Sequence, residues 1–158
     1  MSRAVIEGYA AVFGTPDMSG DVIRPGAFEK LIPVAPGRVK MLSQHAAEAP
    51  VGRWVAMKED AYGLRVRGEV FTDTDAGRNL HRLLAGGALD GLSIGFKPVR
   101  TRRTRTGREI VKADLWEVSI VTFPMAPEAR ITFVGDDGAG ASRPPRDLLS
   151  DLRERGTA

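Results

Sequence analysis

Two residues of the 158-residue chain combine a type and a setting suited to nucleophilic catalysis, namely Ser93 and His45. Ser93 is the centre of Gly91-Leu92-Ser93-Ile94-Gly95, which fits the G-x-S-x-G pattern around the nucleophile of α/β-hydrolases. That fold requires a histidine after the serine, and none follows Ser93. The segment also continues as a predicted strand through Phe96 instead of opening a helix. The α/β-hydrolase fold is therefore excluded, whereas a serine nucleophile with an upstream base is not.

The chain contains two histidines that could act as this base. His45 follows the apolar, strand-like segment Val39–Leu42 and precedes a loop, so it would be held rigidly at a strand end beside a cleft. His81 lies in a predicted helix, away from the centre of its apolar stripe, which is typical of a surface residue. We expect His45 to be the base.

Residues 92–96 and 116–122 alternate between large apolar residues and small or polar ones, as half-buried strands do. One predicted face carries the apolar residues Leu92, Ile94, Phe96, Trp116, Val118 and Ile120. If the two strands pair, Ser93 and Glu117 lie on the same side of the sheet, and Gly95 leaves space there for a substrate backbone. A second interpretation stays open at this point, because serine and glutamate in such a pattern also fit the solvent face of a strand.

Composition removes several other classes of site. Without cysteine the chain has no disulfide, thiolate metal site or cysteine nucleophile. Its histidines form no H-E-x-x-H pattern, and we expect neither a metal nor another cofactor. The absence of a long apolar stretch or secretory signal predicts a soluble, intracellular protein without membrane contact. The net charge is only +3, but five arginines between Arg100 and Arg108 predict a local basic patch.

The hydrophobic periodicity predicts a mainly β fold, a closed or nearly closed β-barrel with a few peripheral helices. Further strands are expected at residues 4–13, 39–44, 51–58 and 63–71, with a hairpin at 100–109 that turns at Thr106-Gly107. One helix should start after a cap at Asp73 or Thr74 and end at Gly86-Gly87, and a shorter one should cover 27–31.

We expect one folded domain over residues 1–135, followed by a flexible tail. The tail, residues 136–158, starts with a stretch rich in glycine and proline that has the composition of a linker. Its leucines at 148, 149 and 152 have the spacing of a short amphipathic helix.

Six segments in register resemble the prohead maturation proteases of tailed phages, from about Glu7 to Val134. They are Glu7–Phe13, Asp21–Phe28, Leu42–His45 with Pro50–Arg53, Gly63–Val66, Gly91–Phe96 and Leu115–Pro124. The family is similar in fold to the herpesvirus assemblins. The resemblance therefore implies a herpesvirus-protease-like barrel and a serine endopeptidase that works through an acyl-enzyme.

Carried over residue by residue, the resemblance implies that His45 is the general base and Ser93 the nucleophile. Glu117 matches the third member of the triad, which is a second histidine in assemblins, and Ser119 is the nearest alternative on that face. Assemblins form their oxyanion hole with a region containing consecutive arginines after this residue. No such pair follows Glu117, and Arg130 is the available candidate.

The implied substrate is the scaffolding segment of the major capsid protein, cut inside the assembling prohead in the host cell cytoplasm. The family also implies self-processing, to which the tail from Asp136 is suited, and self-association as a dimer is left open. A non-catalytic head-assembly protein of the same fold is the alternative function. Nucleic-acid binding by the arginine-rich hairpin is disfavoured, because the run lacks aromatic stacking residues, and contact with an acidic partner or solvent is expected instead.

Overall fold

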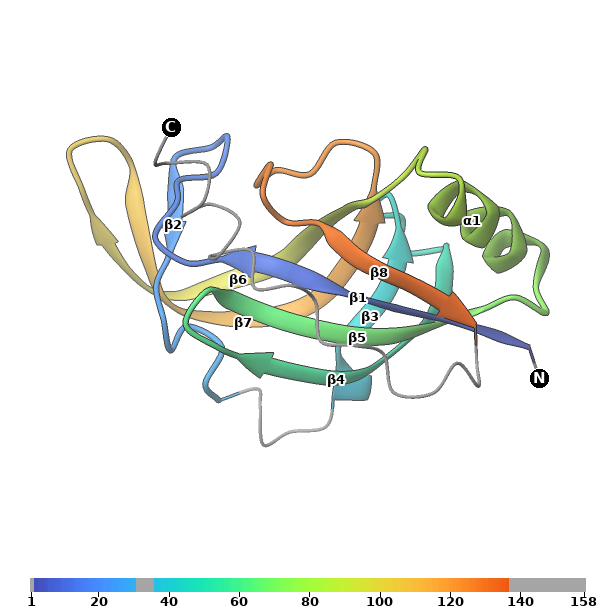
Figure 1. The fold of residues 1–158 in the computed structure, drawn as a ribbon. Helices are drawn as coiled ribbons and strands as arrows, with labels where there is room; N and C mark the ends of the chain where they lie inside the picture. The colour runs from blue at the N-terminus through green and yellow to red at the C-terminus, as the bar shows by residue number, and fades with distance from the viewer. Residues whose placement is uncertain (1, 31–35, 137–158) are drawn as a thin grey trace.

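The computed structural model describes residues 2–30 and 36–136, and these form one curled eight-stranded sheet with one α-helix (Figure 1). The strands are β1 (Arg3–Val12), β2 (Asp21–Ile23), β3 (Lys40–Ser43), β4 (Pro50–Glu59), β5 (Gly63–Phe71), β6 (Gly91–Arg103), β7 (Arg108–Val121) and β8 (Ile131–Asp136). The helices are α1 (Asp75–Ala85) and the short 3₁₀ turn η1 (Pro36–Arg38). The mainly β fold predicted from the sequence is confirmed.

The sheet is ordered β2-β7-β3-β4-β5-β1-β8. On one edge of β7, β2 pairs with its start and β3 with its end, whereas β6 pairs along the opposite edge. Most neighbours are antiparallel, whereas β2 and β3 run parallel to β7. The strands do not close into a continuous ladder. Two backbone hydrogen bonds instead join the start of β6 to the segment before β8, from Leu92 N to Ala129 O (2.9 Å) and from Ile131 N to Asp90 O (2.7 Å). The sheet is thus not closed by strand pairing, and its curled shape is compatible with the predicted barrel.

The interior of the curled sheet is filled by the alternate apolar side chains of its strands. In β5, Leu64, Val66 and Val70 are buried, as the alternation over 63–71 predicts. Trp54 from β4 is the largest fully buried side chain and donates a hydrogen bond from Nε1 to the carbonyl of Val118 in β7 (3.2 Å). This contact connects the core directly to the strand that carries Glu117.

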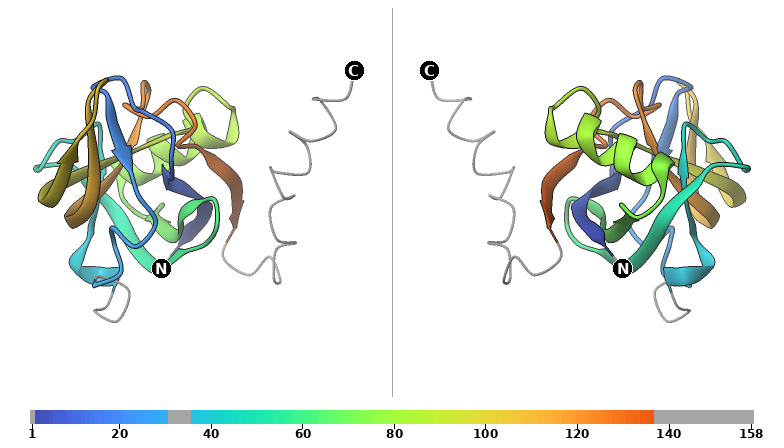
Figure 2. Two further views of the ribbon diagram at one scale, coloured as in Figure 1. Left: turned by 90° about the vertical axis from the view of Figure 1, so that its left-hand side faces the viewer. Right: turned by 90° about the vertical axis from the view of Figure 1, so that its right-hand side faces the viewer.

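Helix α1 lies at one end of the curled sheet, and the β6–β7 hairpin projects from the other (Figures 1 and 2). Thr74 is the N-cap, and its hydroxyl accepts a hydrogen bond from Gly77 N (3.0 Å). The buried face consists of Gly77, Leu80 and Leu84. The predicted helix is confirmed, although Leu83, which the sequence assigns to the apolar stripe, is half-exposed.

The short helix expected at 27–31 is not a helix in its described part. Residues 27–30 form turns, with i to i−3 hydrogen bonds from Ala27 N to Arg24 O (3.1 Å) and from Glu29 N to Gly26 O (3.2 Å). These are the hydrogen bonds of successive turns that start around Gly26, whose φ of 88° lies in the left-handed region. Apart from Asp136, the predicted tail with its short helix lies outside the described residues.

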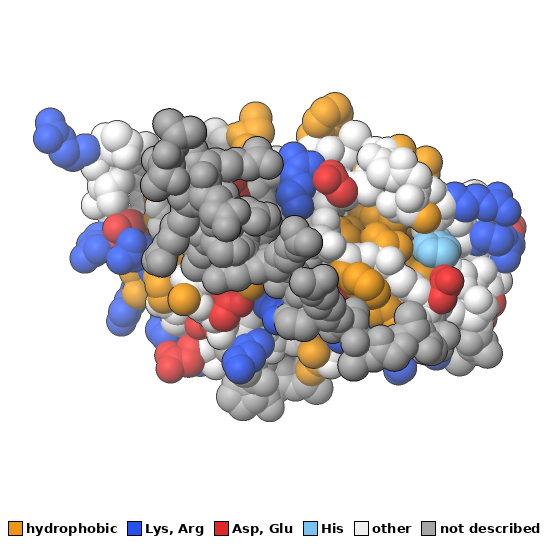
Figure 3. Space-filling view, in the orientation of Figure 1, with side chains coloured by type: hydrophobic (Ala, Val, Ile, Leu, Met, Phe, Trp, Pro, Cys, Tyr) orange, Lys and Arg blue, Asp and Glu red, His pale blue; other side chains and the backbone are white. Residues whose placement is uncertain are grey.

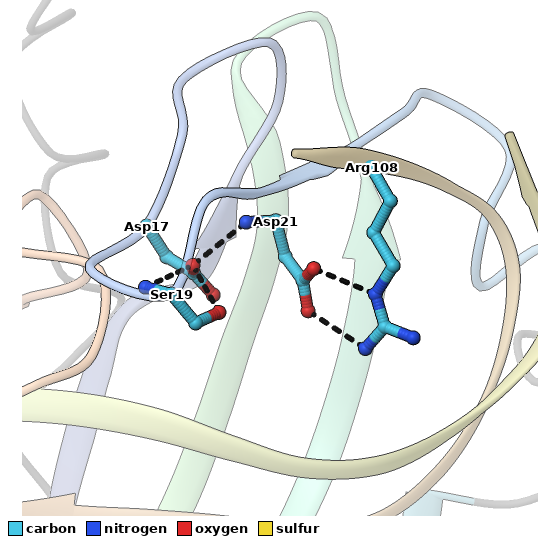
Figure 4. Close-up of polar contacts among 4 residues, drawn as sticks. All are labelled: Asp17, Ser19, Asp21 and Arg108. Carbon is cyan, nitrogen blue, oxygen red and sulfur yellow. Dashed lines mark hydrogen bonds and ion pairs between the residues drawn. The ribbon is translucent and has the colours of Figure 1, made fainter. Parts of the chain in front are cut away.

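An ion pair attaches the β2 region to the base of the hairpin. Asp21 accepts hydrogen bonds from Nε (2.7 Å) and Nη2 (3.1 Å) of Arg108, and this bonding raises the pKa of the guanidinium (Figure 4). Asp17 closes the preceding turn by accepting hydrogen bonds from the backbone of Ser19 (2.9 Å) and Asp21 (3.0 Å). On the face in Figure 3, Lys and Arg side chains lie at this hairpin end and also at the opposite end of the molecule.

A pair of substitutions at the two tryptophans tests how strongly the core depends on Trp54. Trp54→Phe removes the hydrogen bond to Val118 O and leaves a cavity, so we expect the free energy of unfolding to fall by about 1–3 kcal/mol. Trp116 is 59% exposed, and Trp116→Phe should change it by less than about 0.5 kcal/mol. Urea denaturation followed by circular dichroism measures both, and equal midpoints for the two variants would contradict the assigned role of Trp54.

Candidate active site

His45 lies directly after β3, where the chain turns away from the sheet. Gln44 and His45 have φ values of 54° and 60°, in the left-handed region that non-glycine residues seldom adopt. The conformation is held against β7 by hydrogen bonds from Gln44 N to Ile120 O (3.0 Å) and from His45 N to Ser119 Oγ (3.1 Å). Strained backbone of this kind persists only where its surroundings fix it.

Glu117 and Ser119 of β7 complete a hydrogen-bonded cluster with His45. The Nδ1 atom of His45 contacts Oε1 of Glu117, and the Ser119 hydroxyl donates to Oε2 of the same carboxylate. Ser119 is fully buried, and the side chain of Glu117 is 14% exposed against 44% for the His45 ring. The carboxylate is thus held from the buried side, while the imidazole reaches the surface.

Ser93 lies in β6, on the strand paired with the part of β7 that carries this cluster. In the antiparallel β6–β7 ladder Ser93 is directly opposite Ser119, and Gly95 is opposite Glu117. Residues directly opposite on one face have Cβ atoms roughly 5 Å apart. The prediction that Ser93 and Glu117 lie on the same side of the sheet is therefore confirmed. Ser93 is buried, and its hydroxyl forms no hydrogen bond with a described residue, the His45 ring included.

Gly95 has a different use from the one expected. A Cβ atom placed there would lie 2.5 Å from Oε1 and 2.6 Å from Cγ of Glu117. The space above the glycine is therefore filled by the Glu117 side chain, and the interpretation that it admits a substrate backbone is wrong. Glycine at this position lets the carboxylate cross β6 and reach His45.

The alternation of β7 is interrupted at Trp116. The β6–β7 register pairs Gly95 with Glu117 but Phe96 with Leu115, so Trp116 is the extra residue of a β-bulge. Leu115 is buried in the core and Trp116 is exposed, which corrects its predicted place on the apolar face. The bulge keeps Leu115 and Val118 in the core while Glu117 faces the cluster.

The other two residues considered from the sequence lie outside the cluster. Arg130 is held in the loop before β8, with hydrogen bonds from Nη1 to Asp90 (2.7 Å) and from Nε to the carbonyl of Pro127 (2.8 Å). His81 lies on α1, where its Nε2 is 3.9 Å from a carboxylate oxygen of Asp136. Neither contact involves His45, Ser93 or Glu117.

The arrangement is suited to proton transfer from a serine. When Nδ1–H of neutral His45 donates a hydrogen bond to Glu117, the lone pair of the ring is on Nε2. This is the tautomer required of a general base. A carboxylate in this position also stabilises the imidazolium that forms when the base takes a proton. Within the described ranges no group of three or more His, Asp or Glu side chains could hold a metal ion, and no helix is long and apolar enough to cross a bilayer.

Comparisons with known proteins agree with this chemistry. The model of the family described as caudovirus prohead serine protease matches residues 1–141. The prohead protease of Enterobacteria phage HK97 is 34% identical over 154 residues, covering 94% of this chain and 68% of that protein.

Solved herpesvirus proteases share the fold. The KSHV protease with a hexapeptide phosphonate inhibitor has a TM-score of 0.61 at 13% identity, over 98% of this chain and 77% of that chain. The varicella-zoster virus protease has a TM-score of 0.54 at 15% identity, over 97% and 77%. The herpesvirus-protease-like fold expected from the sequence is confirmed.

The dependence of Glu117 on Gly95 gives a direct test of the cluster. In Gly95→Ala the new methyl group would push the Glu117 side chain away from His45, and displacing a catalytic group by about 1 Å lowers rates roughly 10²-fold. We expect Ser93 to react that much more slowly with a fluorophosphonate reagent, measured by intact-mass spectrometry. The control is Gly37→Ala, where a Cβ meets nothing within 4 Å. Unchanged labelling of Gly95→Ala would contradict the role given to Glu117.

Proposed function

The chain belongs to the caudovirus prohead serine protease family, and we propose that His45, Ser93 and Glu117 are its catalytic triad. As a member it is a serine peptidase of capsid maturation. The observation that carries the residue assignment is the contact between His45 and Glu117, next to the rung occupied by Ser93. Ser93 and Glu117 come from β6 and β7, and His45 lies in the turn directly after β3. No other described histidine contacts a carboxylate on that face.

In the proposed reaction His45 Nε2 takes the proton from Ser93 Oγ as the oxygen attacks the scissile carbonyl. The tetrahedral intermediate collapses to an acyl-enzyme, and His45 gives its proton to the departing amine. Water, deprotonated by the same base, then hydrolyses the ester and returns Ser93 to its starting form. Glu117 accepts the hydrogen bond from Nδ1–H of His45 throughout and stabilises the imidazolium form of the ring. The Ser93–His45 hydrogen bond would form when substrate binds, since such bonds are often long in free enzymes.

We further propose that the substrate binds as an extended peptide. Beyond Leu92, no described strand pairs with the edge of β6 opposite β7, and this is the strand that carries Ser93. An exposed strand edge can pair with an added strand through main-chain hydrogen bonds. The family supports the scaffolding segment of the major capsid protein as this peptide, cleaved inside the assembling prohead in the host cell cytoplasm. Cleavage of the chain's own tail and dimer formation are compatible with the proposal.

The arginine-rich hairpin does not favour nucleic-acid binding over this function. Two of its five arginines are paired within the fold, Arg102 with Glu109 (2.7 Å) and Arg108 with Asp21 (2.7 Å). These carboxylates reduce the number of charges free to contact phosphates. A non-catalytic head-assembly role would leave the contact between His45 and Glu117 without a purpose.

Co-expression with a major capsid protein that carries its scaffolding segment tests the proposed reaction. Ser93→Ala should abolish cleavage of the capsid protein and leave the circular dichroism spectrum unchanged, because only one oxygen atom is removed. His81→Gln serves as the control and should cleave normally. Gel electrophoresis and mass spectrometry measure processing, and continued cleavage by Ser93→Ala would defeat the proposal.

The role of Glu117 is tested separately by Glu117→Gln. The amide matches the carboxylate in shape but cannot stabilise imidazolium and favours the wrong histidine tautomer. We expect kcat to fall about 10²- to 10⁴-fold. Glu109→Gln, on the same strand but outside the cluster, is the matched control. Equal rates for the two variants would require a different third member.

A further inference from the structure

We propose that Ser119 is a positioning residue that fixes the tautomer and the backbone of the general base. The proposal rests on the triad proposed above and adds a fourth residue to it. Ser119 contacts both His45 and Glu117, and it is fully buried near the end of β7.

Hydrogen-bond donors and acceptors account for the first part of this role. The Ser119 hydroxyl has one hydrogen, which it gives to Oε2 of Glu117, and its oxygen accepts the backbone N–H of His45 (3.1 Å). Oε1 of Glu117 faces Nδ1 of His45, and when the carboxyl is ionised this oxygen can only accept a hydrogen bond. The ring of three hydrogen bonds is then consistent in one direction, with the hydrogen of the His45 ring on Nδ1. Nε2 is then the free basic atom.

The second part of the role concerns the strained backbone at Gln44 and His45. Ser119 Oγ accepts a hydrogen bond from the backbone N–H of His45. Two more hydrogen bonds join the Gln44 side chain to Thr122, one from Gln44 Nε2 to Thr122 Oγ1 (2.8 Å) and one from Thr122 N to Gln44 Oε1 (3.2 Å). The residue that orients the acid is therefore the same one that holds the base in its left-handed conformation. Loss of its hydroxyl would loosen both partners at once.

The same contacts exclude Ser119 as the nucleophile. Its only hydrogen points to a carboxylate that already binds the histidine, so no base is left to remove it. Ser93, directly opposite in the ladder, has its hydroxyl free of hydrogen bonds to described residues. Ser119 is thus the alternative third member suggested by the sequence, but with a supporting role beside Glu117.

Replacement of Ser119 by alanine tests the proposal on the full-length chain. With the capsid protein purified from Ser93→Ala co-expression as substrate, we expect kcat to fall about 10- to 100-fold, the range found for outer-shell residues that orient metal-ligating histidines, and KM to change less than about threefold. Ser119→Thr keeps the oxygen and should recover most of the lost kcat. Ile120→Val, the buried neighbour whose side chain faces the core, controls for destabilisation of β7 and should retain wild-type kcat.

A spectroscopic measurement separates positioning from simple structural support. In ¹⁵N-labelled protein with Ser93→Ala to prevent turnover, long-range ¹H–¹⁵N correlation reports the tautomer of each of the two histidines. His45 should be the Nδ1–H tautomer, and Ser119→Ala should convert it to a mixture, whereas Ile120→Val should not. An unchanged tautomer and kcat in Ser119→Ala, or equal losses in Ile120→Val, would overturn the proposal. This readout needs no protease activity, so it decides the role of Ser119 even if Ser93→Ala still cleaves and the proposed function fails.

Discussion

The pairing of β7 with β3 on one edge and β6 on the other is the constraint on which the site depends. The ladder places Ser119 opposite Leu42 in one direction and opposite Ser93 in the other. A slip of one residue would turn every side chain of a strand to the opposite face. The buried Val118 opposes such a slip, because it would have to leave the core and the hydrogen bond that its carbonyl accepts from Trp54.

Much of the fold is predictable because it follows from periodicity. The alternation over residues 63–71 predicts the bounds of β5. The N-cap Thr74 and the C-terminal Gly86 likewise mark the two ends of α1. The failures occur where local geometry overrides the pattern. Trp116 leaves the apolar face through a bulge, and residues 27–30 form turns after the positive φ of Gly26. Neither a bulge nor the choice between turn and helix is fixed by apolar spacing.

The candidate site divides in the same way. His45 and Ser93 could be selected from residue type, chain order and family likeness, and the parity of two strands placed Glu117 on their side. The contact of Ser119 with His45 could not be predicted, because it depends on a parallel pairing between strands far apart in the sequence. The prediction of substrate space at Gly95 fails for a related reason. The sequence shows that a side chain is missing there, but not that the side chain of Glu117 fills the space.

The parallel pairing of β3 with β7 also determines when the site can exist during synthesis. His45 and Ser93 emerge from the ribosome before β7, which ends at Val121 and carries Glu117 and Ser119, the two residues that contact the proposed base. Pairing of distant segments is slow, because the entropy cost of closing the loop between them comes before the contacts are gained. A growing or partly folded chain therefore contains the proposed nucleophile without an oriented base. On the proposed assignment, the chain can act as a peptidase only after β7 has been made and has paired with β3.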